Sequence, residues 1–425
     1  MKVNHNHALK DKGVSNTLQS SLLPRHRWYS YKEGFSPSLV NHAITNLKDF
    51  DKNNDIIFDP FNGSGTVTLF SSLKGYNSIG IEVNPFSVFI SKVKEINLSK
   101  QEMSIFQKEK DYVIKKCRIG KKSPLLNFST FSEKINNKKW LFNPHVLNSF
   151  EGGYNYLNSI GNTKIRSLLK LALVNSAMDN CNAKKDGKCL RYKKDWKDKD
   201  YNINSFIDSI ELNINNYLED INRSSILCKS KILKGDSRHL LKTHSTKFKL
   251  CLTSPPYLNS FDYTDIYRPE LFLGHFITLP SDLYKLRSKT LRSHINHIET
   301  FSRNKSFGAN YDKVIQSINE SNISLWSSKI PSMIQSYFED MEIVLTNLRR
   351  NASENAQLWL IVGNSAYADL EIPTDLILAE IGGRCKWYLQ EIGVLRYLHK
   401  RGSKYSPNIS MLRESVIIFS TGSKT

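Results

Sequence analysis

Two short turns carry the residue types best suited to chemistry. The first covers residues 59–66, has the sequence DPFNGSGT and follows an apolar run at 55–58. Its glycines, Gly63 and Gly65, permit a tight bend and a close approach of the backbone to a ligand, and the N–H groups of a following helix face that ligand. Glu82 ends the next apolar run, where its carboxylate can accept hydrogen bonds from ribose hydroxyls. The spacing differs from G-x-G-x-x-G and no lysine follows the second glycine, so a phosphate cradle of the Walker type is disfavoured.

The second turn is Ser254-Pro255-Pro256-Tyr257, just after the apolar run at 248–252. The two prolines fix their φ angles and remove two backbone donors. The result is a rigid turn that presents carbonyl acceptors, the Ser254 hydroxyl and the aromatic face of Tyr257. Such a group suits a planar ring with an exocyclic amine, because the oxygens accept the amine hydrogens while the tyrosine stacks on the ring. A proline-rich turn around a buried tyrosine is the competing interpretation, and the position at the end of a strand favours function.

These turns need a sheet to position them. The pattern over 55–95 predicts strand, turn, helix, strand, turn and helix, with the first helix at 67–73, the second strand at 78–82 and Pro85 at the start of the second helix. This βαβ unit predicts an α/β domain with a mostly parallel sheet. Asp59 then lies at the carboxyl end of the first strand, where open α/β sheets bind ligands.

The composition narrows the class of partner. A chain of 425 residues predicts two to three domains. The net charge of +20 indicates a polyanionic partner such as nucleic acid, with improved solubility as the alternative explanation. No run approaches the ~18–20 apolar residues of a membrane helix, and the first residues lack the apolar core of a signal peptide, so we expect no membrane partner.

Cysteine and histidine usage argues against metal binding. The six cysteines are scattered without a CxxC pair, which disfavours a zinc ribbon and a disulfide framework and predicts a reducing, cytoplasmic location. His26, His145 and His239 lack the spacing of metal ligands, so no metal site is expected. None of the six cysteines follows a proline, which disfavours the cysteine nucleophile that methylation of cytosine at carbon 5 requires.

Taken together, the motifs resemble those of a known family. DPFNGSGT followed by Glu82 resembles the S-adenosylmethionine motif of amino-methylating DNA methyltransferases, and TSPPY resembles their catalytic tetrapeptide in the version associated with cytosine-N4 methylation. Adenine-N6 enzymes more often have Asp or Asn before PPY. The segment 27–37 resembles the stretch that closes over the methionine moiety, Asp236 resembles the acidic residue that meets the adenine, and 358–363 and 414–419 resemble later strands of the sheet.

The resemblance implies a Rossmann-like methyltransferase sheet, S-adenosylmethionine as cofactor and a set of site residues. The implied catalytic residues are Ser254, Pro255, Pro256 and Tyr257, and the implied cofactor-binding residues are Trp28, Asp59, Phe61, Gly63, Gly65, Thr66, Glu82 and Asp236. The target amine lies inside a duplex, so the base must be flipped out, and Tyr257 is expected to hold it by stacking. We hypothesise that Asp262, Tyr263 and Asp265 line the same pocket; a polar loop is the alternative.

The implied activity is that of a site-specific type II methylase of a restriction-modification system. It transfers a methyl group to N4 of cytosine in double-stranded DNA and protects that DNA from a separately encoded restriction endonuclease. Three alternatives stay open: adenine-N6 methylation of DNA, methylation of a glutamine amide in a protein, and a non-catalytic nucleic-acid-binding module with a relict cofactor site.

The predicted organisation has six segments. They are a flexible N-terminus at 1–24, the cofactor half of the methyltransferase domain at 25–97, a mainly helical insertion at 98–229, the catalytic half at 230–262, a candidate DNA target-recognition region at 263–330, and the remaining strands and helices of the methyltransferase domain at 331–425. The region that recognises the DNA target is expected in 263–330, in the insertion at 98–229, or in both. Arg287, Arg292 and Arg303 are candidate base readers, and the charged stretch 184–199 is a candidate for phosphate contacts; a solvated surface is the alternative for each.

Overall fold

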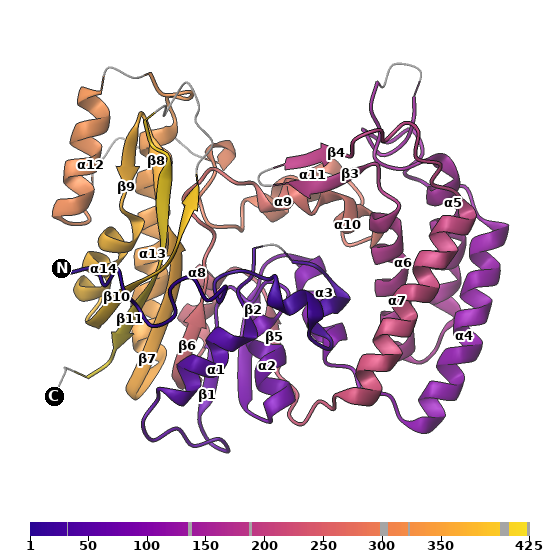
Figure 1. Cartoon of the computed structure of the whole chain (residues 1–425), viewed down its shortest axis with the longest axis horizontal. Coiled ribbons are helices and arrows are strands. Elements are labelled where there is room, and N and C mark those ends of the chain that lie inside the picture. The colour runs from indigo at the N-terminus through magenta and orange to yellow at the C-terminus, as the bar shows by residue number, and fades with distance from the viewer. Residues whose placement is uncertain are drawn as a thin grey trace.

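The protein is built on one central, mostly parallel sheet (Figure 1). The computed structural model describes residues 1–31, 33–134, 138–186, 189–297, 305–321, 324–399 and 408–422. The seven strands lie in the order β10-β11-β7-β6-β1-β2-β5, and β11 runs antiparallel to both of its neighbours. Their bounds are β1 Ile56–Asp59, β2 Asn77–Glu82, β5 Lys231–Lys234, β6 Phe248–Thr253, β7 Ala352–Gly363, β10 Tyr388–His399 and β11 Met411–Ser420. The predicted α/β fold class is confirmed.

The first βαβ unit forms as its sequence predicts. Helix α2 (Thr66–Lys74) begins after Gly65 and ends at Gly75, which adopts the left-handed conformation (φ +77°) that glycine accepts without strain. Helix α3 (Pro85–Lys94) begins at Asn84, whose side chain accepts a hydrogen bond from the Phe86 N–H. Because both helices start at the carboxyl end of a strand, the two turns before them face the same edge of the sheet.

Alternate side chains of the strands fill a hydrophobic core on each face of the sheet. Ile57 and Leu250 point into one core, and Phe58 and Cys251 point into the other. The first core is closed by α1 (Pro37–Thr45) and α2. The second is closed by helices that come later in the chain, which are α8 Ser237–Thr243, α13 Ile330–Asn351 and α14 Thr374–Arg384.

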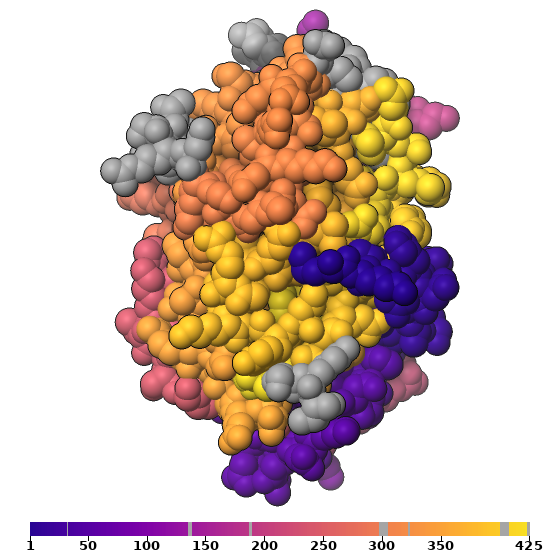
Figure 2. Space-filling model, turned by 90° about the vertical axis from the view of Figure 1, so that its left-hand side faces the viewer, coloured from indigo at the N-terminus to yellow at the C-terminus, as the bar shows by residue number. Residues whose placement is uncertain are grey.

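The N-terminal residues lie against the sheet, in contrast to the expected flexible segment at 1–24. The Asn4 N–H donates to the Ile392 carbonyl of β10 at 2.8 Å, and Leu9 and Val14 are buried in the core beside α1. Figure 2 shows this segment in indigo, lying against the yellow residues from near the C-terminus. The physical reason is that apolar residues recur in an otherwise polar stretch, so the segment has a face to bury.

A separate helical region lies between β2 and β5 in sequence and beside the sheet in space (Figure 1). Its long helices pack around α6, whose leucines are buried on most sides, and share a core with α3. It consists of α4 Lys100–Ile119, α5 Pro144–Tyr156, α6 Thr163–Asp179, α7 Ile203–Arg223 and the hairpin of β3 Ala183–Asp186 with β4 Cys189–Tyr192. These elements fall within the segment 98–229.

Short helices follow the Ser254–Tyr257 turn, and they pass from the sheet toward the helical region (Figure 1). They are α9 Tyr263–Ile266, α10 Arg268–Leu273 and α11 Pro280–Arg287; α12 Ala309–Glu320 then packs near β9. The remaining elements are β8 Ser365–Tyr367, β9 Leu370–Ile372 and the 3-10 turns at Gln19–Leu22, His26–Trp28, Leu157–Ser159 and Ile295–His297. Arg303 lies outside the described residues. In the part of the chain that the structure describes, the helices are too short or too polar to span a bilayer.

Candidate active site

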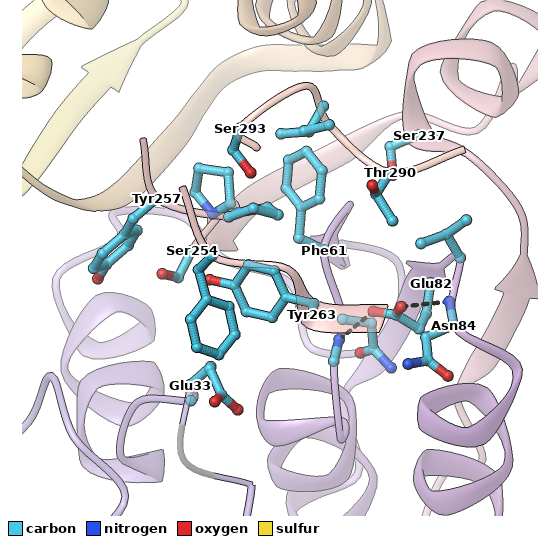
Figure 3. A pocket seen from close by; sticks show the side chains of 18 of the residues that line it. Glu33, Phe61, Glu82, Asn84, Ser237, Ser254, Tyr257, Tyr263, Thr290 and Ser293 are labelled. Carbon is cyan, nitrogen blue, oxygen red and sulfur yellow. Dashed lines mark hydrogen bonds between the residues drawn. The ribbon is translucent and has the colours of Figure 1, made fainter. Parts of the chain in front are cut away.

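The two predicted turns open into one cavity of about 790 Å³ at the carboxyl ends of β1, β2 and β6. Figure 3 shows Ser254 and Tyr257 on one side of this cavity, Glu82 and Asn84 on the other, and the rings of Phe61 and Tyr263 between them. The predicted residues that line it are Asp59, Phe61, Gly63, Thr66, Glu82, Asp236, Ser254, Pro255, Pro256 and Tyr257. Cofactor and catalytic candidates therefore share one space.

Glu82 clamps the glycine turn to the end of β2. One carboxylate oxygen accepts the Gly63 N–H at 2.8 Å and the other accepts the Asn84 N–H at 2.7 Å (Figure 3). Burial raises the pKa of Glu82, while these backbone hydrogen bonds favour the charged form. Each carboxylate oxygen can accept a second hydrogen bond, so the side chain can still receive two vicinal hydroxyls.

Asp59 joins the two turns to each other. Its Oδ1 accepts the Thr253 hydroxyl at 2.6 Å and the Phe61 N–H at 3.0 Å. Thr253 is the last residue of β6 and immediately precedes Ser254. Burial raises the pKa of Asp59 to about 7, against the effect of these two donors. The contacts make Asp59 a cross-link between the turn at 59–66 and the Ser254–Tyr257 turn.

Asp236 begins helix α8 and takes part in a buried ionic network. It accepts the Arg238 N–H at 2.9 Å and forms an ion pair with the Arg238 guanidinium at 2.7 Å. Arg238 also lines the cavity and pairs at 2.9 Å with Asp340 on α13. Asp340 in turn pairs with Arg292 at 2.7 Å, in the loop after α11. The network fixes one wall of the cavity, and contact between Asp236 and an adenine stays a prediction.

The Ser254–Tyr257 turn is held in place at its tyrosine. The Tyr257 hydroxyl donates to Glu414 on β11 at 2.8 Å. The ring lies against Gly363 at the end of β7, where an added Cβ would come within 2.9 Å of Tyr257. Burial and the nearby Glu414 charge raise the pKa of Tyr257 well above its usual range, so the side chain stays a phenol.

The residues after the catalytic turn divide between the cavity and the surface. Asp262 and Tyr263 line the cavity as hypothesised, whereas Asp265 is mostly exposed and lies 3.7 Å from Arg268. Arg287 forms an ion pair with Asp262 at 2.6 Å. Since Arg292 is also paired, two of the candidate base readers are engaged with carboxylates in this structure.

Two predicted cofactor residues do not touch the cavity. Trp28 lies in the core of the helical region, where its ring packs at 38° to that of Tyr217 with the centroids 4.8 Å apart. Its indole N–H donates to Asp220 at 2.8 Å. Gly65 instead lets α2 approach α3, because an added Cβ would lie 2.8 Å from the Ser91 Cβ. Both residues therefore support the fold around the site, and the expectation that Trp28 covers the cofactor does not match its position.

Several lining residues were not predicted as site residues, although two of them, Tyr31 and Glu33, lie in the segment 27–37 that was expected to close over the methionine moiety. Glu33 and Tyr31 come from the segment before α1, where Tyr31 stacks on Tyr267 at 5.0 Å between ring centroids and Tyr267 donates to Glu33. Arg396 and Glu414 come from β10 and β11. Glu414 begins the run 414–419 that was predicted as a strand, but nothing in that run indicated that its side chain belongs to the site. Thr290 and Ser293, in the loop after α11, also line the cavity (Figure 3). No sequence pattern predicted this position for them.

The lining fits S-adenosylmethionine in its chemistry. Carboxylates at Glu33, Asp59 and Glu82 suit a sulfonium cation and hydroxyl or amino donors, and aromatic faces suit a purine. Gly63 adopts φ +49° and a Cβ there would meet the Tyr31 ring at 3.2 Å, so the turn can present bare backbone to a ligand. Among the described residues no group of His, Cys, Asp and Glu is arranged to hold a metal ion.

Comparisons with known proteins agree with this site. The family model for "DNA methylase" (N6_N4_Mtase) matches residues 10–93. The type II methyltransferase M.BsoBI of Geobacillus stearothermophilus is 28% identical over 411 residues, covering 84% of this chain and 77% of that protein. The type II methyltransferase M.AvaI of Nostoc sp. is 27% identical over 420 residues, covering 88% and 81%. The chain resembles the amino-methylating DNA methyltransferases of restriction-modification systems.

Two further comparisons are more limited. The type II methyltransferase M.MjaII of Methanocaldococcus jannaschii is 44% identical over 69 residues, 16% of this chain and 12% of that protein. Among solved structures, the rRNA methyltransferase aviRa of Streptomyces viridochromogenes aligns over 98% of this chain and 96% of its own, with a TM-score of 0.32 and 9% identity. The longer matches support an S-adenosylmethionine-dependent DNA methyltransferase of the N6/N4 class, and S-adenosylmethionine is the cofactor that they and the site indicate.

Proposed function

We propose that the protein methylates the exocyclic N4 of cytosine at a specific site in double-stranded DNA, and so protects that DNA from a cognate restriction endonuclease. The observation that carries the proposal is the meeting of the Ser254–Tyr257 turn and the Gly63–Glu82 clamp in one cavity. The charge of +20 supports a nucleic-acid substrate over a protein substrate.

The turn supplies acceptors for the hydrogens of the target amine. An exocyclic amine conjugated into a ring is a weak nucleophile, because its lone pair is shared with the ring. If the Ser254 hydroxyl oxygen and the Pro255 carbonyl accept its two hydrogens, the nitrogen can become tetrahedral and present its lone pair for attack. Most of the acceleration then comes from positioning and from acceptors already in place, and no covalent bond to the protein is required.

The cofactor side of the cavity fixes the direction of attack. S-adenosylmethionine, when bound, supplies an electrophilic methyl group on a sulfonium. The Glu82 clamp and the turn at Gly63 would hold its ribose, and Asp236 its adenine. Glu82 lies across the cavity from Ser254 (Figure 3), so a ligand held there can direct its methyl group toward the amine.

Cytosine rather than adenine is proposed because of the residue before the two prolines. A serine at position 254 matches the cytosine-N4 version of the tetrapeptide, whereas Asp or Asn is more frequent in adenine-N6 enzymes. Either base must leave the duplex to reach the cavity, and the Tyr257 ring, fixed at its hydroxyl, offers a surface on which a flipped base can stack.

The deciding experiment is transfer of labelled methyl from S-adenosylmethionine to unmethylated duplex DNA, followed by digestion to nucleosides. Label in N4-methylcytosine is the expected result. Label in N6-methyladenine would keep the cofactor and the DNA substrate but overturn the choice of base. Absence of label in DNA, with S-adenosylmethionine still bound in calorimetry, would overturn the DNA substrate and direct the search to RNA or to a protein glutamine.

A further inference from the structure

A second, small cavity of about 40 Å³ adjoins the large one at the glycine turn. Tyr31, Ser64 and Thr66 line both cavities, so the two adjoin at the start of α2. Residues of the N-terminal segment, including Ser20, and Lys94 of α3 line the rest of the small cavity. Its volume suits a group of a few atoms rather than a whole ligand.

Lys94 brings a buried cation to this small cavity. The residue is 2% exposed, and its Nζ donates one long hydrogen bond, 3.4 Å, to the Ser64 carbonyl. An ammonium has three hydrogens, and in the described part of the chain no carboxylate pairs with this one. Burial lowers the pKa of Lys94 to about 7 because no opposite charge offsets it. A buried charge without a partner is costly, so the site favours an anion.

The position of Lys94 follows from the close contact between α2 and α3. Because Gly65 has no Cβ, α3 passes the turn at a distance where an added Cβ would lie 2.8 Å from the Ser91 Cβ. Lys94 comes three residues after Ser91, on the same face of the helix, and so reaches the Ser64 carbonyl.

Ser20 contributes a second, independent polar group. Its hydroxyl is buried and has no hydrogen-bond partner within the described residues, although it lines the small cavity. His26 also lines this space, but burial and the Lys94 charge lower its pKa to about 3, so its ring stays neutral. The small cavity therefore combines one cation with an unused hydroxyl donor, which is a donor set for a carboxylate.

We propose that the small cavity is the subsite for the carboxylate of S-adenosylmethionine, with Lys94 as its counter-ion and Ser20 as a second donor. The carboxylate is the only anionic group of this cofactor, and the large cavity offers it carboxylates that would repel it. Glu82 accepts the Gly63 N–H, so a ribose held there lies one residue from Ser64. The inference rests on the cofactor side of the proposed function and not on the choice of methyl acceptor.

Truncation of protein and ligand together tests the subsite. Calorimetry without DNA measures the Kd of S-adenosylmethionine and of its decarboxylated analogue, which keeps the sulfonium, the amine and the adenosine. Lys94→Met keeps the length of the side chain and removes its charge. It should weaken S-adenosylmethionine by about 10- to 100-fold and leave the Kd of the analogue within about twofold of wild type. Equal losses for the two ligands, or a wild-type Kd for S-adenosylmethionine, would overturn the proposal.

Two further variants separate carboxylate binding from general effects. Lys92→Met changes an exposed lysine on the same helix and should leave both Kd values unchanged. Ser20→Ala removes the hydroxyl donor and retains Lys94, so it should weaken S-adenosylmethionine by about 3- to 10-fold and spare the analogue. A Ser20→Ala protein with wild-type affinity for both ligands would contradict the assignment of a second donor.

Thermal unfolding without ligand gives a readout that a structural role would move in the opposite direction. Lys94→Met removes a buried, unpaired charge, so the variant should be at least as stable as wild type, and S-adenosylmethionine should raise its Tm by less. A variant that is less stable than wild type, yet gains as much from the cofactor, would show that Lys94 supports the fold and would overturn the subsite.

Failure of the subsite and failure of the proposed function give different results. A wild-type protein that binds S-adenosylmethionine and its decarboxylated analogue with the same Kd overturns the subsite alone. A protein that shows the expected selectivity but labels no DNA overturns the DNA substrate and leaves the subsite in place. A protein that binds neither ligand overturns the cofactor, and both proposals with it.

Discussion

At the scale of single residues, the proposed chemistry depends on oxygens that the fold already holds in fixed hydrogen bonds. Tyr257 is held through Glu414, Glu82 through two backbone N–H groups, and Asp59 through Thr253. Fixed acceptors need little reorganisation when charge develops on a substrate, which is the condition under which they contribute most to rate. Two consequences at this scale can be measured.

Replacing Ser254 by alanine should separate turnover from cofactor binding. Ser254→Ala removes an acceptor for the target amine, so kcat should fall by about 100-fold while the Kd of S-adenosylmethionine stays nearly constant. Steady-state kinetics and calorimetry measure the two quantities. Ser306→Ala, at a site outside the cavity, is the matched control. A parallel loss of cofactor affinity would contradict the assignment of Ser254 to the substrate side.

Asp59 should make stability depend on pH. Its pKa is about 7 in the folded protein against 3.8 as the ordinary value, so the folded state binds more protons between these values and stability falls as pH rises from about 4 to 7. Asp59→Asn removes this effect. The free energy of unfolding of the Asp59→Asn protein, minus that of the wild type, should therefore rise by up to about 4 kcal/mol between pH 4 and 7 and stay constant above pH 7.

Urea unfolding at several pH values measures this difference. The same change at Asp265, whose side chain is 58% exposed, is the control. Stability curves for wild type and Asp59→Asn that stay parallel between pH 4 and 7 would contradict the prediction.

At the scale of elements, local sequence predicted the βαβ unit around residues 55–95 because its glycines, Pro85 and apolar runs act within one or two turns of chain. It placed Glu82, Ser254 and Tyr257 at strand ends that the sheet then brought together. It did not predict the role of Gly65. That role depends on the distance between α2 and α3, which no local pattern encodes.

Gly65 should therefore affect stability before it affects binding. Gly65 has φ +86° and an added Cβ would meet Ser91, so Gly65→Ala should lower the free energy of unfolding by about 1–3 kcal/mol. Gly161→Ala, where nothing lies within 4 Å, should change it by less than about 0.5 kcal/mol. Chemical denaturation measures both. A Gly65→Ala protein with wild-type stability but no affinity for S-adenosylmethionine would restore the direct cofactor role.

At the scale of the whole molecule, the site is assembled from segments far apart in the chain. The cavity takes Glu33 from near the start, Ser254 from the middle and Glu414 from near the end. Short motifs revealed the first two regions because glycine and proline mark turns. They could not reveal Arg396 and Glu414, since the pairing of β10 with β11 and the approach of Tyr257 are set only by the complete sheet.

The edge of that sheet leads to a further prediction. β10 is an edge strand, and the segment around Asn4 covers part of it. Removal of residues 1–9 should expose unpaired backbone groups of β10 and promote association between molecules, which light scattering would detect. A shortened protein that stays monomeric at the concentration where the full chain is monomeric would contradict this.

The contact between Asn4 and Gly393 also has a consequence for synthesis. The ribosome makes the first of these residues almost four hundred positions before the second. At about 5–20 residues per second, the N-terminal segment waits for a time on the order of a minute before its binding surface exists. The N-terminal segment can therefore cover the edge of the sheet only after β10 has been synthesised. Until then the segment is accessible to chaperones.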